Sequence, residues 1–223
     1  MRPRIKICCI ASIDEARLAI EAGASALGLV STMPSGPGVI PWERIAEIAA
    51  AVPPPIATFL LTCSQDAEEI VAQQRRCGTS VIQICDRLER SAYADIRRAL
   101  PGIRLVQVVH VAGDALVEEA RAAAPHVDAI LLDSGNQSLA VKELGGTGRV
   151  HDWTLSARIR ASIGVPVFLA GGLRADNVRA ALDAVQPFAL DVCSGVRTNG
   201  ALDAAKLRAF VDAVSRSTRV RGA

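Results

Sequence analysis

The sequence feature that most constrains the fold is a repeated alternation of two kinds of segment. Short apolar runs rich in β-branched residues alternate with stretches that have the apolar spacing of an amphipathic helix. The eight apolar runs are Ile5–Ile10, Ser25–Val30, Ile56–Leu61, Ser80–Ile84, Ile103–His110, Ala129–Asp133, Val165–Ala170 and Ala189–Val192. The helical stretches that follow them are Ile13–Ala22, Trp42–Ala51, Gln65–Arg76, Ser91–Leu100, Asp114–Ala124, Leu155–Ile163, Ala175–Val185 and Asp203–Ser215.

Eight strand–helix units predict an α/β fold, a single (β/α)8 TIM barrel that spans residues 1–223 as one domain. Most of the strands are continuous apolar runs, which is typical of parallel strands covered on both faces. A barrel of this kind takes about 200 to 250 residues, and the chain has 223. The same alternation would also suit a doubly wound open sheet, but eight units favour the closed barrel.

The composition excludes several classes of protein. Half of the residues are hydrophobic and only 3% are aromatic, so aliphatic side chains must fill the core. The net charge of +2 is too small to indicate nucleic acid or an anionic membrane as an obligate partner. No apolar run approaches the roughly 18 residues of a membrane span, and the first residues lead into a strand rather than a signal peptide. We therefore expect a cytoplasmic protein, either a monomer or a homodimer.

The cysteines and histidines do not indicate a metal site or a disulfide framework. The six cysteines contain no C-x-x-C pair, and the three histidines show no zinc-ligand spacing. We expect no metal and no cofactor, and we expect most cysteines to be small buried side chains in a reducing compartment.

Glycine clusters follow the last three predicted strands and indicate a phosphate site. They comprise Gly145, Gly146 and Thr147 after the sixth strand, Gly171 and Gly172 after the seventh, and Ser194 and Gly195 after the eighth. Glycine lets backbone N–H groups approach an anion closely, and TIM barrels often bind phosphate in these loops. The alternative is that the glycines only make tight turns, but the presence of three clusters favours phosphate.

Polar residues on the first strand predict reactive groups at the mouth of the barrel. Because strand side chains alternate, Lys6 and Cys8 share one face, while Ile5, Ile7 and Cys9 share the other. Ile5 and Ile7 are apolar and suit the layer that faces the helices. The opposite face, with Lys6 and Cys8, should therefore point toward the mouth of the barrel. A neighbouring ammonium group favours the thiolate, so Cys8 is a candidate base or nucleophile. An inert buried cysteine is the alternative.

Two carboxylates lie at or near the carboxyl ends of apolar strands, where the active sites of TIM barrels collect. Asp133 ends the sixth strand, and Asp191 lies within the eighth. Each is a candidate for the site, with helix capping or loop bonding as the alternative role.

The motifs together resemble those of the phosphoribosylanthranilate isomerase family over residues 4–212. The resemblance rests on the order and spacing of motifs in the first, second, sixth, seventh and eighth units. These motifs are Lys6-Ile7-Cys8, Ala26-Leu27-Gly28-Leu29-Val30, Leu131-Leu132-Asp133-Ser134, Gly145-Gly146-Thr147-Gly148, Leu169-Ala170-Gly171-Gly172 and Asp191-Val192-Cys193-Ser194-Gly195.

The resemblance implies an Amadori rearrangement of N-(5-phosphoribosyl)anthranilate in tryptophan biosynthesis. A general acid opens the ribose ring and a general base removes the C2 proton, with no cofactor. The family's acid and base correspond to Asp133 and Cys8. We expect the sugar-phosphate substrate to contact a further set of polar residues, namely Lys6, Gln83, Asp191 and Arg197.

The chain departs from the family pattern at the end of the site that holds the substrate's carboxylate. Gly38 stands where the family has a carboxylate-binding arginine, and Cys85 stands where it has a histidine. Cys9 replaces the glycine after the catalytic cysteine, and Arg197 replaces a glutamate. Arg197 is therefore a candidate to bind the carboxylate, with a solvent-exposed position as the alternative.

Three readings of the function follow from these residues. The paired Cys8 and Asp133 favour the isomerase. A second reading is a related barrel that acts on another phosphosugar, including a different aminated sugar phosphate. A histidine-pathway isomerase would place an aspartate at Cys8, and an indole-glycerol-phosphate synthase would need early glutamates that are missing. A third reading is a non-catalytic barrel that only binds the ligand.

Overall fold

The computed structural model describes residues 3–111, 113–135, 139–144 and 148–219, and it confirms the (β/α)8 barrel. Eight parallel strands form a closed barrel in the order β1 to β8, and β8 pairs with β1. This closure excludes the open sheet. The strands are β1 (Arg4–Ile7), β2 (Ala26–Val30), β3 (Ala57–Thr62), β4 (Val81–Ile84), β5 (Arg104–His110), β6 (Ala129–Asp133), β7 (Val167–Leu169) and β8 (Ala189–Val192).

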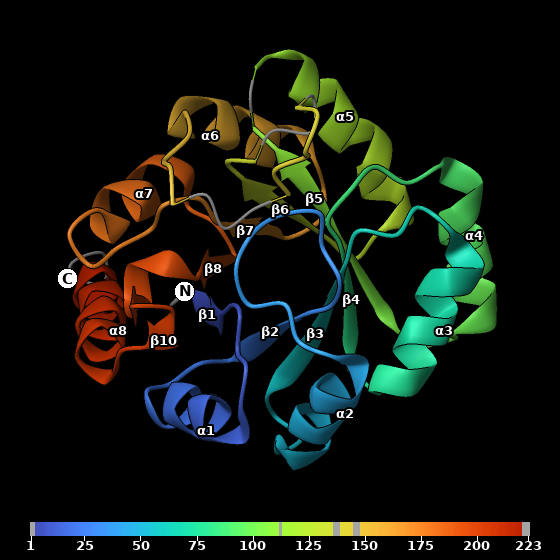
Figure 1. Ribbon diagram of the computed structural model, residues 1–223. Helices are drawn as coiled ribbons and strands as arrows, with labels where there is room; N and C mark the ends of the chain where they lie inside the picture. Colours follow the sequence, from blue (N-terminus) through green and yellow to red (C-terminus); the bar gives the residue numbers. More distant parts are fainter. Residues whose placement is uncertain (1–2, 112, 136–138, 145–147, 220–223) are drawn as a thin grey trace.

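The helices surround the barrel and cover the outer faces of the strands (Figure 1). They are α1 (Ile13–Glu21), α2 (Trp42–Ala51), α3 (Ala67–Cys77), α4 (Arg90–Ala99), α5 (Ala115–Ala123), α6 (Trp153–Ser162), α7 (Val178–Val185) and α8 (Ala204–Arg219). The short elements are η1 (Ala124–His126), η2 (Ser194–Val196) and the hairpin of β9 (Arg197–Thr198) and β10 (Ala201–Leu202). Among the described residues, no helix has both the length and the apolar character needed to cross a membrane.

Capping residues explain where several helices begin. Ser12 accepts a hydrogen bond from the N–H of Glu15 at the start of α1, and Asp152 accepts one from Thr154 at the start of α6. Such side chains satisfy backbone N–H groups that have no partner within the helix. The cap at Asp152 starts α6 two residues earlier than the sequence pattern predicts.

Two apolar layers follow from the alternation of strand side chains. The larger layer lies between strands and helices and includes Ile5 and Ile7, as predicted. The smaller layer fills the barrel interior and includes Phe59 and Phe168, whose rings meet edge to face at 5.8 Å. The loops that follow the strands gather at one end of the barrel, where they surround a pocket.

Candidate active site

A pocket lies at the carboxyl ends of the strands, which is where TIM barrels carry out chemistry. Its walls combine polar groups from β4, β6, β8 and the segment after β1 with apolar side chains such as Val30, Leu61 and Leu144. Ser35, in the loop after β2, donates a hydrogen bond to the carbonyl of Lys142 in the loop after β6, at 2.6 Å. These two loops therefore meet beside the pocket.

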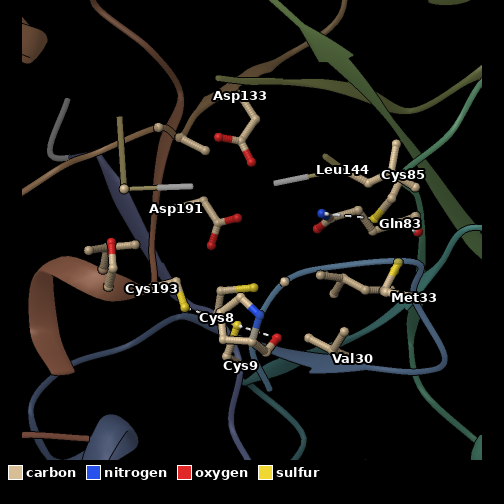
Figure 2. Close-up of a pocket in the computed structure, with 18 of the residues that line it drawn as sticks. Cys8, Cys9, Val30, Met33, Gln83, Cys85, Asp133, Leu144, Asp191 and Cys193 are labelled. Atoms are coloured by element: carbon tan, nitrogen blue, oxygen red, sulfur yellow. Dashed lines mark hydrogen bonds between the residues drawn. The ribbon is translucent and has the colours of Figure 1, made fainter. Parts of the chain in front are cut away.

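Asp133 and Cys8 point into the pocket from opposite sides (Figure 2). Asp133 ends β6, and its Oδ1 accepts a hydrogen bond from the N–H of Ser134 at 2.7 Å, which fixes the carboxylate. Cys8 follows β1, and its N–H donates to the carbonyl of Val192 at 2.9 Å. The two side chains that the sequence identified as acid and base thus share one cavity.

Gly28 on β2 provides the space that Cys8 occupies. A Cβ atom at this position would lie 2.9 Å from the Cys8 sulfur and 3.0 Å from the Lys6 nitrogen. Only glycine leaves room for both side chains on the neighbouring strand. Close packing inside the barrel therefore explains why the β2 motif has a glycine at position 28.

Asp191 lies between Asp133 and Cys8 in Figure 2 and forms an ion pair with Lys6. Lys6 is fully buried, its Nζ is 2.9 Å from Asp191 Oδ2, and it also lies over the ring of Phe59. Burial alone would lower the pKa of Lys6, but the charge of Asp191 and the hydrogen bond raise it. The expectation that Lys6 reaches the mouth is therefore wrong. Lys6 lies outside the pocket lining, and its contact with the site is the ion pair with Asp191.

Two polar atoms in the pocket have no partner among the described residues. They are Oδ1 of Asp191 and Oε1 of Gln83, both buried. Burying an acceptor without a hydrogen bond is costly, so such atoms indicate positions for ligand groups. Gln83 is on β4 and lines the pocket, and its contact with a substrate stays a prediction.

The predicted phosphate loops converge on one side of the pocket. Gly171, Gly172 and Ser194 line it, and Gly195 follows in the same turn. The N–H groups of these four residues donate to no described residue. Free N–H groups beside one another suit an anion. The expected contacts from Gly145, Gly146 and Thr147 lie outside the described residues.

The prediction that Cys9 faces the helices is wrong. β1 ends at Ile7, and Cys9 has a φ of 63°, so the alternation of strand side chains does not extend to it. Its side chain belongs to the interior layer and lines the pocket, where its sulfur is 2.9 Å from that of Cys193. The family's glycine at this position was the available signal, because glycine tolerates a positive φ.

Arg197 occupies neither of the two positions considered for it. Its guanidinium binds Glu15 at 2.9 Å and the carbonyls of Cys8 and Cys9 at 3.2 and 2.6 Å. The side chain is only 8% exposed and lies outside the pocket lining. Arg197 therefore holds the corner after β1 in place and does not point at a ligand.

Gly38 packs directly against Cys9. A Cβ atom at Gly38 would lie 2.5 Å from Cys9 Cβ, and Gly38 has a φ of 82°. The two positions that depart from the family pattern thus fit one another. None of the described residues that line the pocket is a lysine or an arginine.

Sequence reasoning missed the apolar wall and Cys193. Met33, Leu144 and Ala170 line the pocket, but apolar residues near strand ends give no distinct signal in a sequence that is half hydrophobic. Cys193 was identifiable only through the pairing of β8 with β1, which brings it beside Cys8 and Cys9.

Comparison with known proteins finds one family, both by a family model and by individual relatives. The family model of N-(5'-phosphoribosyl)anthranilate (PRA) isomerase matches residues 5–213. The isomerase of that name from Haloferax volcanii is 36% identical over 212 residues, which cover 94% of this chain and 92% of that protein. An isomerase from Methanosarcina mazei is 33% identical over 210 residues, covering 93% and 92%.

Solved structures of phosphoribosyl anthranilate isomerases are similar to this chain along almost its whole length. The structure of phosphoribosyl anthranilate isomerase from Thermotoga maritima aligns with a TM-score of 0.82 at 27% identity and covers 96% of this chain and 99% of that chain. A structure in complex with reduced 1-(o-carboxyphenylamino)-1-deoxyribulose 5-phosphate aligns with a TM-score of 0.80 at 26% identity, covering 96% and 99%.

Proposed function

Since the chain belongs to the N-(5'-phosphoribosyl)anthranilate isomerase family, we propose that it catalyses the family's Amadori rearrangement, with Asp133 as general acid and Cys8 as general base. It is an aldose–ketose isomerase of tryptophan biosynthesis. The observation that carries the assignment of roles is the placement of Asp133 and Cys8 on opposite sides of one pocket (Figure 2).

Ring opening is the first step. Asp133 donates a proton to the ribose ring oxygen while the anilino nitrogen supplies electrons, so that the C1–O bond breaks and a Schiff base forms. The backbone N–H of Ser134 keeps the carboxyl group oriented toward the pocket. General acid catalysis of this kind contributes about 10² to 10⁴ in rate.

Proton removal from C2 is the second step. The Cys8 sulfur takes this proton as a base, and the C2–H electrons move toward the cationic nitrogen to give an enol amine, which tautomerises to the ketose. The substrate's own nitrogen is the electron sink, so the reaction requires no cofactor. Asp191 Oδ1 and Gln83 Oε1 are buried pocket atoms without a partner among the described residues, and we expect them to accept hydrogen bonds from the sugar hydroxyls.

We expect inorganic phosphate to bind beside Gly171, Gly172 and Ser194 and to inhibit competitively. The Gly195→Ala variant should weaken this inhibition about tenfold, because an added Cβ would lie 1.9 Å from the carbonyl oxygen of Leu173 and force the two loops apart. The matched control is Gly164→Ala, where an added Cβ meets nothing within 4 Å. A sulfate-soaked crystal with the anion elsewhere would contradict the site.

The carboxylate of the substrate has no cationic partner among the described lining residues. We expect Gly38→Arg alone to be destabilised by about 2 kcal/mol or more, from the positive φ and the overlap with Cys9. Adding Cys9→Gly removes the overlap with the Cys9 Cβ and sulfur but leaves the positive φ of residue 38. The double variant should therefore recover part of the lost stability and show a lower KM for phosphoribosylanthranilate. The measurements are urea unfolding and steady-state kinetics. A KM equal to that of Cys9→Gly alone would show that the arginine does not reach the carboxylate.

A fluorescence assay with phosphoribosylanthranilate generated in situ tests the proposed function directly. The unmodified chain should convert this substrate, and the Asp133→Asn variant should not do so at a comparable rate. Absence of turnover by the unmodified chain, with phosphate binding intact, would favour a different aminated sugar phosphate or a purely ligand-binding barrel.

We propose that the reaction takes place in the cytoplasm, as suits a biosynthetic enzyme whose six cysteines are all free. Nothing in the charge of the chain calls for nucleic acid as a partner. One Thermotoga maritima relative is described as dimeric. Sedimentation analysis distinguishes monomer from homodimer for this chain.

A further inference from the structure

Two cysteines outside the acid–base pair meet at the edge of the pocket. Cys9 follows β1 and Cys193 follows β8, and the pairing of these strands brings together residues that are 184 positions apart. Their sulfurs are 2.9 Å apart and share a hydrogen bond, visible as a dashed line in Figure 2. A disulfide has a sulfur–sulfur distance of about 2.05 Å, so a small movement would join them.

From this geometry we propose that Cys9 and Cys193 form a thiol modification site, which a hydroperoxide oxidises to a disulfide that closes off part of the pocket. The inference goes beyond the isomerase reaction, which uses neither sulfur. It also gives Cys9 a role that the family's glycine cannot have.

The backbone around Cys9 keeps its sulfur directed at Cys193. The left-handed conformation of Cys9 turns its side chain into the pocket, and Gly38 packs against its Cβ from the other side. Three further contacts hold this corner, because the Cys9 sulfur donates to the carbonyl of Pro37 and Arg197 binds the carbonyls of Cys8 and Cys9. The pair is therefore preorganised.

The surroundings of Cys193 favour its thiolate. The pKa of Cys193 is lowered, first by the hydrogen bond with Cys9 and then by the charge of Arg197. Burial and the charge of Asp191 act in the opposite direction but are outweighed. The same hydrogen bond raises the pKa of Cys9. A thiolate is the form that reacts with peroxides. Cys193 is thus the sulfur that reacts first, and Cys9 is the resolving thiol.

The oxidation balances as two displacement steps. The Cys193 thiolate attacks one oxygen of the hydroperoxide, the O–O bond breaks, and the sulfur becomes a sulfenic acid while the other oxygen leaves and takes a proton. Cys9 then loses its proton and attacks the sulfenic sulfur, the S–O bond breaks, and hydroxide leaves as water with that proton. Two thiols are oxidised by two electrons and the hydroperoxide is reduced; a dithiol reverses the change by exchange.

Closing the disulfide would alter the catalytic site. Cys8 is adjacent to Cys9 in the chain, and Cys193 lies between Asp191 and Ser194, which we expect to contact phosphate. A displacement of about 1 Å at a reacting group can reduce rates about a hundredfold. We expect the turnover rate of the oxidised protein to be about tenfold to a hundredfold lower than that of the reduced protein. Treatment with a dithiol should restore the original rate.

The test is treatment of the full chain with hydrogen peroxide followed by tryptic mass spectrometry. A cross-link between peptides 7–17 and 180–197 is expected in the unmodified chain and in the control variant Cys63→Ser, which loses a partly exposed thiol elsewhere. It should be absent in Cys193→Ser and in Cys9→Ser. Each variant's activity is compared before and after oxidation with its own reduced form.

Three outcomes would overturn the proposal. The first is oxidation of Cys193 to sulfinic acid with no cross-link. The second is a cross-link that persists in Cys9→Ser, since that would join Cys8 to Cys193. The third is a cross-linked protein with unchanged turnover. The cross-link is read by mass whatever reaction the pocket catalyses, so failure of the isomerase assignment and failure of this proposal are distinguishable.

Discussion

The Asp133→Asn variant is expected to turn over phosphoribosylanthranilate at least about a hundredfold more slowly than the unmodified chain. An asparagine fits the same space and can still accept the hydrogen bond from the N–H of Ser134, but it has no acidic proton for the ring oxygen. The loss should appear in kcat, with KM and the melting temperature nearly unchanged. Asp212→Asn, which alters an exposed carboxylate on α8, is the control.

The Cys8→Ser variant should show a loss of the same size, because a hydroxyl group is a far weaker base than a thiolate. Cys63→Ser is the control, since it removes a thiol that donates a hydrogen bond to the carbonyl of Thr32 and takes no part in the proposed chemistry. Near-normal kcat in either Asp133→Asn or Cys8→Ser would remove that residue from the mechanism.

The second large effect concerns stability, at the ion pair between Lys6 and Asp191. Replacing Lys6 by methionine should reduce the free energy of unfolding by about 3 to 5 kcal/mol, because it leaves a buried carboxylate without its cation. Equilibrium unfolding in urea measures the change. Arg158→Met, which breaks an exposed ion pair with Asp114, should cost about 1 kcal/mol or less.

The cost of Lys6→Met should depend on pH. Burial raises the pKa of Asp191, and the charge of Lys6 opposes this rise. Without Lys6, the pKa of Asp191 in the folded variant should therefore lie further above its unfolded value than it does in the unmodified chain. A raised folded-state pKa stabilises the fold at pH values below the unfolded pKa, and this stabilisation is lost as the pH rises through the folded pKa. The loss of unfolding free energy in Lys6→Met, relative to the unmodified chain, should therefore be smallest in acid and increase toward neutral pH. A deficit that does not change with pH would mean that Asp191 is not the group left unpaired.

The fold was predictable because its signal is repeated eight times. Each β-branched run followed by a helical period indicates one unit, and the strand ranges Ala129–Asp133 and Ala189–Val192 agree with the structure. The ends of helices were harder to locate. α7 starts at Val178, three residues later than the pattern predicts, because Asn177 accepts a hydrogen bond from the N–H of Arg174 and holds the preceding residues in a turn.

The positions of Cys8 and Asp133 followed from their places at or near strand ends, where alternation and the barrel geometry apply, whereas Gln83 was predicted only from the resemblance to the family. Cys9 lies just beyond the strand, and its backbone conformation depends on contacts with Gly38 and Cys193 that only the closed barrel creates. The partner of Arg197 is Glu15, which lies 182 positions away. Neither periodicity nor a motif encodes such a pairing.

The pairing of β1 with β8 also determines at what point during synthesis the barrel can close. Lys6 and Asp191 are 185 positions apart, so β1 leaves the ribosome long before its ionic partner has been synthesised. Until then the first strand has an open edge and an ammonium group that water must hydrate. Joining such distant segments carries a loop-closure cost that is repaid only when the last strand docks. The residues that complete the pocket are therefore also those that complete folding, and a truncated chain that lacks β8 lacks a finished barrel as well as a phosphate site.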